Sequence, residues 1–91
     1  MSLAKAFSPA LREVRILFSQ TGDASQGVRQ FVVSTYPTLK QHNPDLPILI
    51  REAQGTPARA FARFERGVER NVTLDGLSSK DVTTKISELL R

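Results

Sequence analysis

Charged and apolar residues alternate over residues 11–18, the first stretch of the chain with a regular pattern. Val14, Ile16 and Phe18 supply the apolar positions, and charged residues lie between the first two and before them. A period of two with one apolar side is typical of a β-strand that packs one face on a core. We therefore predict a strand over residues 11–18.

A helical period follows after a polar break at residues 19–25. From Val28 to Leu39 apolar and semipolar residues recur at i, i+3, i+4, i+7, i+8 and i+11, which indicates a single apolar stripe on a helix. Pro37 interrupts the stripe, because proline lacks an N–H group and crowds the preceding turn. We expect either a kink near residues 33–36 or a second short helix that begins at Pro37.

The segment Asn-Pro-Asp-Leu-Pro-Ile-Leu-Ile-Arg-Glu, residues 43–52, is the most informative in the chain. Pro44 forces Asn43 out of the helical region, so the helix must end there. Residues 48–50 are three consecutive apolar residues with no polar position between them. Such a run predicts a strand that is covered on both faces, at the centre of a parallel β-α-β unit.

Two further strands and a helix complete the pattern. The breakers at 55–57 precede a strand over residues 60–65, a turn at Arg66-Gly67 and a strand over residues 68–74, which together predict an antiparallel hairpin. Ser78 and Asp81 have the spacing of a capping box before a C-terminal helix. The predicted class is α/β, in the order β-α-β-β-β-α, with a four-stranded mixed sheet and helices on both faces.

Composition narrows the possible functions. The 91 residues include no cysteine, which excludes disulfides, thiolate metal sites and thiol redox chemistry. The net charge of +4 falls on two separate segments, and the aromatic residues fall mostly on predicted core faces, so we expect no nucleic-acid partner. No apolar run approaches the roughly 20 residues that cross a bilayer, so we expect no direct membrane insertion.

Catalytic and cofactor motifs are also missing from the sequence. The single histidine, His42, has no triad-like neighbours and is expected to end the first helix, where a positive ring favours the helix dipole. Neither a glycine-rich phosphate loop nor metal-ligand spacing is present. We therefore expect a protein that is not an enzyme and that has no cofactor and no metal.

Four segments resemble a known family in order and spacing: residues 11–16, 25–29, 43–52 and the Asn71-Val72 pair. The chain is similar, over about residues 11–90, to small thioredoxin-like accessory subunits of mitochondrial respiratory complex I (NADH:ubiquinone oxidoreductase). The resemblance implies a single thioredoxin-like domain over residues 11–91, preceded by an N-terminal extension at 1–10.

The same resemblance implies a function. It predicts a non-catalytic accessory subunit in a hetero-oligomer, peripheral on the matrix side of the mitochondrial inner membrane and docked on the large iron–sulfur core subunit. The family also includes mitochondrial ribosomal proteins, so a ribosomal protein that binds rRNA and protein is the alternative. Two cysteines of some family members correspond to Ser19 and Ala53 here, and residues 19–25 occupy the place of the thioredoxin Cys-x-x-Cys, so thiol chemistry is not inherited.

Candidate partner contacts are polar residues of the strands, of the hairpin turn and of the first turn of the first helix. They are Arg12, Arg15, Ser25, Gln26, Gly27, Arg29, Arg51, Glu52, Arg63 and Arg66. Arginines can hold a partner's carboxylates in bidentate pairs, and the N–H groups of a helix start can hold an anion. Gly27 permits close backbone approach, either within the packing of helix on sheet or at an interface, and the resemblance favours the interface. Pro57 stands where thioredoxin-like folds place a cis-proline, so a cis Thr56-Pro57 bond is expected.

Overall fold

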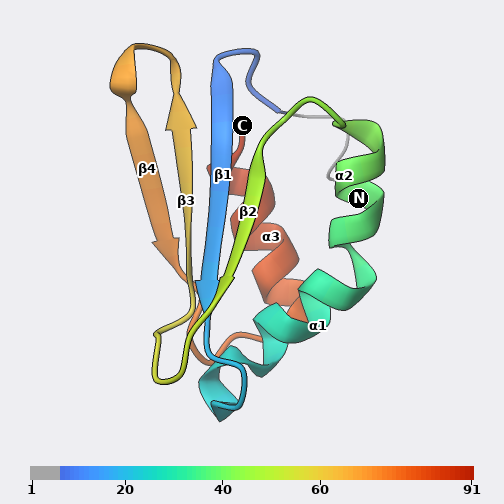
Figure 1. Cartoon of the computed structure of the whole chain (residues 1–91), viewed down its shortest axis with the longest axis vertical. Helices are drawn as coiled ribbons and strands as arrows, with labels where there is room; N and C mark the ends of the chain where they lie inside the picture. Colours follow the sequence, from blue (N-terminus) through green and yellow to red (C-terminus); the bar gives the residue numbers. More distant parts are fainter. Residues whose placement is uncertain (1–6) are drawn as a thin grey trace.

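The computed structural model describes residues 7–91 of the chain, without the side chain of His42. Within these residues a sheet and three helices follow one another along the chain (Figure 1). Their bounds are β1 (Leu11–Phe18), α1 (Gln26–Ser34), α2 (Tyr36–His42), β2 (Ile48–Glu52), β3 (Arg59–Phe64), β4 (Glu69–Thr73) and α3 (Ser79–Leu89). Short 3-10 turns, η2 and η3, occupy Asp23–Ser25 and Glu65–Gly67. The predicted first strand, hairpin and C-terminal helix are confirmed.

The sheet has four strands in the order β2-β1-β3-β4. β1 pairs with β2 in parallel and with β3 antiparallel, and β3 pairs with β4 antiparallel. The α/β class and the mixed sheet are therefore confirmed. β2 lies at an edge, however, so the prediction that residues 48–50 form the centre of the sheet is wrong. Ile48 is buried in the core, whereas Leu49 and Ile50 are only half-buried.

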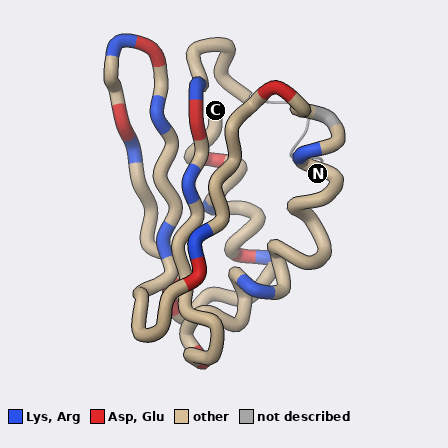
Figure 2. Tube along the Cα trace, in the orientation of Figure 1, with Lys and Arg blue, Asp and Glu red and all other residues tan. Residues whose placement is uncertain are grey.

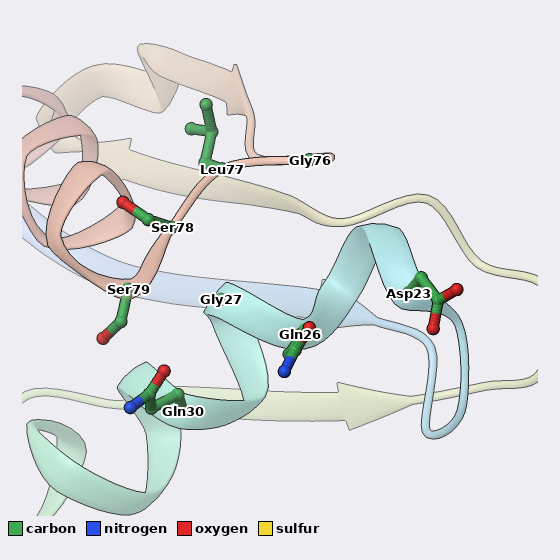
Figure 3. A pocket seen from close by; sticks show the side chains of 8 residues that line it. All are labelled: Asp23, Gln26, Gly27, Gln30, Gly76, Leu77, Ser78 and Ser79. Carbon is green, nitrogen blue, oxygen red and sulfur yellow. The ribbon is translucent and has the colours of Figure 1, made fainter.

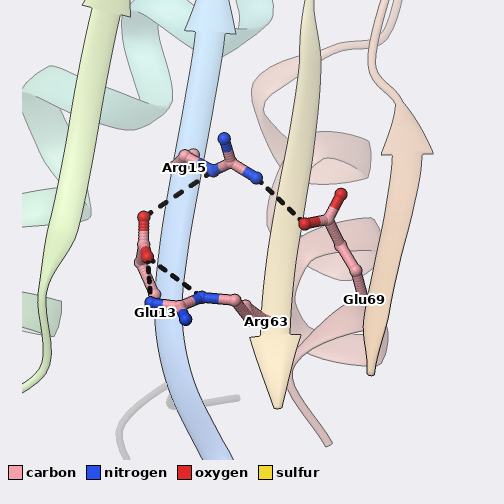
Figure 4. A network of polar contacts seen from close by, with 4 residues as sticks. All are labelled: Glu13, Arg15, Arg63 and Glu69. Carbon is pink, nitrogen blue, oxygen red and sulfur yellow. Dashed lines mark hydrogen bonds and ion pairs between the residues drawn. The ribbon is translucent and has the colours of Figure 1, made fainter. Parts of the chain in front are cut away.

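The helices lie on one face of this sheet, and the prediction of helices on both faces is wrong (Figures 1 and 4). Val14, Ile16 and Phe18 point into the core, which they share with buried residues of all three helices. The alternate positions of β1 point to the other face, which we call the open face. The connection from β2 to β3 spans only residues 53–58, which is too short for a crossover helix over that face.

The break between α1 and α2 takes the second of the two predicted forms. Thr35 ends α1 and also begins α2, with φ −112° and ψ −34°. Pro37 lies in the first turn of α2, where a missing N–H group costs nothing because that turn has no internal acceptor to reach. The proline therefore starts a new helix and does not distort the old one.

The turn at residues 43–47 is fixed to the end of α2. The Asn43 side chain donates to the Leu39 carbonyl at 3.0 Å, and Lys40 Nζ donates to the Leu46 carbonyl at 2.8 Å. Val14 N then donates to the Pro47 carbonyl at 3.0 Å, which begins the parallel pairing. The most informative sequence segment is thus a structural connection that sets where β2 meets β1.

All peptide bonds among the described residues are trans, so the prediction of a cis bond before Pro57 is wrong. The chain turns one step earlier, where Thr56 N donates to the Ala53 carbonyl at 3.2 Å. Gly55 adopts φ +74° at the third position of this turn, a conformation that suits glycine. The reversal is complete before the proline is reached.

The two ends of the described chain meet beside the sheet. Ser8 N donates to the Leu90 carbonyl at 2.9 Å, and Glu65 N donates to the Ala10 carbonyl at 2.8 Å. Phe7 also packs on the core. Residues 7–10 of the predicted extension therefore dock on the domain, while residues 1–6 lie outside the described part of the chain.

Candidate partner-binding surface

The open face has a network of ion pairs over its upper half, as oriented in Figure 1, toward the β3–β4 turn (Figure 4). Glu13 accepts from Arg63 at 2.6 Å and lies 3.7 Å from Arg15, and Arg15 in turn reaches Glu69 at 3.0 Å. Acidic and basic positions alternate along this part of the sheet (Figure 2). The carboxylates of the chain itself therefore neutralise these arginines.

A separate pair at the edge of the same region involves Arg12 and Glu65. Three of the arginines that the sequence offered as partner contacts, at positions 12, 15 and 63, therefore already have a carboxylate within the chain. Exposed pairs of this kind contribute about 0–1 kcal/mol to stability. They also leave less charge available for a partner.

The lower half of the open face is different, because its arginines have no acidic partner. The strand register places Arg51, Leu17 and Arg59 side by side on β2, β1 and β3. Both arginines are exposed, and neither has an ion pair with any residue among 7–91. Leu17 between them is half-buried.

Phe61 occupies the middle of the open face, and two arginines lie over its ring. The guanidinium carbons of Arg15 and Arg59 are each 5.3 Å from the ring centroid. Phe61 is half-buried and is paired with Arg15 across the strands. The ring is therefore not in the helix-covered core, where the sequence pattern mostly placed the aromatic residues.

Arg51 and Glu52 cannot act as one contact site, although they are neighbours in the sequence. Successive residues of a strand point to opposite faces. The pairing of Arg51 with Leu17 places it on the open face, so Glu52 belongs to the helix side. Arg66 is exposed in the turn between β3 and β4, with φ 64°.

The first turn of α1 serves the fold itself. The Ser25 hydroxyl is buried and accepts from Ser19 N at 3.0 Å. Arg29 donates to the carbonyls of Ser19 and Gly22 at 3.0 and 2.7 Å, so it fixes the loop that follows β1. The loop with the sequence position of a thioredoxin Cys-x-x-Cys is therefore held by hydroxyl, amide and guanidinium groups.

Gly27 also makes its close approach inside the chain. It is buried against the backbone of Leu77 and Ser78, directly before α3. An ideal Cβ at this position would overlap the Leu77 carbonyl oxygen and would lie 2.9 Å from the Ser78 carbonyl carbon. The structure thus gives Gly27 a role in packing α1 against the start of α3.

A shallow depression of about 370 Å³ lies where the first turns of α1 and α3 approach each other (Figure 3). Its lining is polar, with Gln26 and Gln30 on one side and Ser79 on the other. No buried side-chain polar atom in residues 7–91 lacks a hydrogen-bond partner. The depression therefore presents no buried group that is waiting for a ligand.

The described residues contain no group of three His, Cys, Asp or Glu side chains that could hold a metal ion. None of the helices within residues 7–91 has the length and apolar character to cross a membrane.

Sequence reasoning missed Leu17, Arg59 and Phe61 as members of this surface. The alternation within each strand predicts which residues share a face, but not which strands are neighbours. The antiparallel register of β1 and β3 brings Leu17 beside Arg59. That long-range pairing was needed to find the surface.

Comparison with known proteins shows clear relatives. Residues 28–79 match the family described as the mitochondrial ribosomal protein L51 / S25 / CI-B8 domain. The chain is 45% identical over 91 residues to a Neurospora crassa protein named NADH-ubiquinone oxidoreductase 10.5 kDa subunit. The matched residues cover 100% of this chain and 97% of that relative.

Two further relatives share the name NADH dehydrogenase (ubiquinone) 1 alpha subcomplex subunit 2. The Arabidopsis thaliana protein is 41% identical over 91 residues, which cover 100% of this chain and 94% of the relative. The Mus musculus protein is 42% identical over 80 residues, which cover 88% of this chain and 81% of the relative. The similarity thus extends over more than four fifths of each protein.

Proposed function

Because the chain belongs to the L51 / S25 / CI-B8 domain family, we propose that it is an accessory subunit of mitochondrial respiratory complex I. The observation that supports this most is the full-length identity of 45% to a relative named as an NADH-ubiquinone oxidoreductase subunit. The other relatives have names of the same kind. The matches cover 97% and 94% of the first two relatives, so they are not confined to one part of those proteins.

The proposed role is non-catalytic. The chain has no cysteine, and residues 19–25, where a thioredoxin would place its thiols, are held by hydrogen bonds of the Ser19, Ser25 and Arg29 side chains. The subunit acts by binding other subunits and by supporting assembly or stability. Its site is peripheral, on the matrix side of the inner membrane, and its main partner is the large iron–sulfur core subunit.

The experiment uses the Neurospora crassa relative as its reference. A strain that lacks the 10.5 kDa subunit is complemented with an epitope-tagged copy of this chain. Mitochondrial membranes are separated by blue-native electrophoresis, and the gel is stained for NADH dehydrogenase activity. We expect the tag to migrate with the active band. A tag that never enters this band would contradict the proposal.

A mitochondrial ribosomal protein is the second candidate, because the matching family model also describes ribosomal proteins. The same tagged strain tests it by sedimentation of mitochondrial lysate in a sucrose gradient. Migration with a ribosomal subunit, lost after ribonuclease treatment, would favour this candidate. The names of the full-length relatives favour complex I.

A further inference from the structure

We propose that the open face of the sheet binds an α-helix of a partner subunit, whose two carboxylates pair with Arg51 and Arg59 on either side of Leu17. The proposal rests on the proposed function, because it names the surface through which the subunit joins its complex. It also states the chemistry of the partner: a helix with acidic residues seven positions apart and apolar residues between them.

Helices cover one face of the sheet and leave apolar side chains on the other. All-parallel sheets are almost always covered on both faces, whereas a mixed sheet can have one face open. Here β1 and β2 are parallel, and the helices of the chain cover one face only. Leu17, Leu49 and Phe61 are left half-buried on the other face. A helix from another chain would supply the missing layer.

Paired and unpaired charges lie on different halves of the open face. The upper half of the open face is neutralised by its own ion pairs, as at Glu13 and Arg63. In the lower half Arg51 and Arg59 are exposed and have no acidic partner among the described residues. Arginine is enriched at the centres of protein interfaces because its planar head pairs with carboxylates and stacks on aromatic rings. The unpaired arginines select an acidic partner.

The separation of Arg51 and Arg59 across the sheet fits the repeat of a helix. Arg51, Leu17 and Arg59 lie on three neighbouring strands, and neighbouring strands are about 4.8 Å apart, so the two arginine backbones are about 10 Å apart. A helix rises about 1.5 Å per residue and returns to the same face after seven residues, about 10.5 Å further on. An extended strand offers same-face positions at roughly 7 and 13 Å, and neither distance fits.

In the resulting arrangement the partner helix crosses the strands. Its apolar residues at i+3 and i+4 lie over Leu17, and its two acids reach outward to the arginines. A second copy of this chain does not fit, because the carboxylates of its open face, Glu13 and Glu69, already pair with arginines of their own chain. The partner is therefore a different protein.

The first test reverses the two charges in the complemented Neurospora crassa strain. The Arg51→Glu/Arg59→Glu variant is compared with Lys80→Glu/Lys85→Glu, a matched change of charge at two exposed positions of α3. We expect the tag signal of the open-face variant in the active complex I band to fall about tenfold, because like charges then face each other. The α3 variant should remain at the level of the unaltered chain.

Controls separate folding from binding. Neither arginine has an ion pair within residues 7–91, but Arg59 lies over the Phe61 ring. The purified variants should therefore unfold cooperatively, with a Tm only a few degrees below that of the unaltered chain. Arg51→Gln/Arg59→Gln, which removes charge without reversing it, should give a smaller loss of co-migration. If both open-face variants co-migrate as well as the α3 variant, the proposal is wrong and the proposed function still stands. If the unaltered chain does not co-migrate, both fail.

The second test identifies the partner segment. Because the chain has no cysteine, Thr73→Cys on the open face introduces a single thiol beside Arg59, and a benzophenone maleimide attached there is a site-specific crosslinker. Thr84→Cys on α3 is the control. The proposal expects a crosslink from position 73 to a helical segment with acids seven residues apart. A crosslink to RNA, to a second copy or to a segment without such acids would overturn it.

Discussion

Replacing Gly27 by alanine tests the close approach of α1 to the backbone before α3. In most helices this change increases stability, because alanine has the higher helix propensity. Here the added Cβ would overlap the carbonyl oxygen of Leu77 and lie 3.0 Å from its carbonyl carbon. Both atoms belong to the backbone, so no side-chain rotation relieves the overlap. We expect Gly27→Ala to destabilise the protein.

The magnitude follows from two opposing terms. Alanine in a helix gains about 1 kcal/mol over glycine. Overpacking costs typically about 1–3 kcal/mol, and this position belongs at the upper end because α1 and the start of α3 must move apart. The free energy of unfolding should therefore fall by about 2 kcal/mol. For a domain of this size that corresponds to a Tm about 10 °C lower.

The assay is urea unfolding followed by far-UV circular dichroism, with thermal unfolding as a second measurement. Gln26→Ala is the matched control, because Gln26 is the preceding residue of the same helix and is exposed. Its free energy of unfolding should stay within about 0.5 kcal/mol of the unaltered protein. If Gly27→Ala is as stable as the unaltered protein, or more stable, the inferred packing of α1 on the start of α3 is wrong.

Three further changes probe other elements, each by urea unfolding. Ser78→Ala removes the side chain that caps α3 and should lower the free energy of unfolding by about 1 kcal/mol. Ser79→Ala should leave it nearly unchanged, and equal losses for the two variants would contradict the assigned cap. Glu13→Gln removes the acid shared by two arginines and should cost at most about 1 kcal/mol. That loss should largely vanish at about 1 M NaCl, and a salt-independent loss would argue against an ion pair. Gly55→Ala should lower the free energy of unfolding by about 1 kcal/mol, because residue 55 has a positive φ that alanine adopts at a cost. Nothing lies within 4 Å of the new Cβ, so no overlap adds to this cost. An unchanged free energy would show that the turn has another conformation.

Local patterns in the sequence predicted most of the elements. The alternation in residues 11–18 requires only that neighbouring side chains point to opposite faces, and β1 has those bounds. Pro37 and Pro44 act on their own backbone and on the residue before them, so the start of α2 and its end could be anticipated. Such effects extend over a few residues, and a single sequence contains them.

The candidate site depended on contacts that no local pattern contains. An apolar run such as residues 48–50 does not distinguish an edge strand from a central one, and only the strand order places β2 at the edge. The resemblance favoured an interface for Gly27, and no local pattern could show its contact with Leu77, which is fifty positions away in the sequence. Likewise, Arg15 and Arg63 looked like free cations until the register placed them beside Glu13.

The order of strands has a consequence for how the chain acquires its structure. The first strand to be synthesised, β1, becomes an interior strand, and its antiparallel neighbour β3 is made only after α1, α2 and β2. The last helix supplies Val82, Ile86 and Leu90 to the core, and the Leu90 carbonyl holds Ser8 near the N-terminal end. These core residues are not available while the end of α3 is still inside the ribosomal tunnel, so the native fold cannot close before they emerge. We expect a nascent chain stalled before Ile86 to remain sensitive to protease.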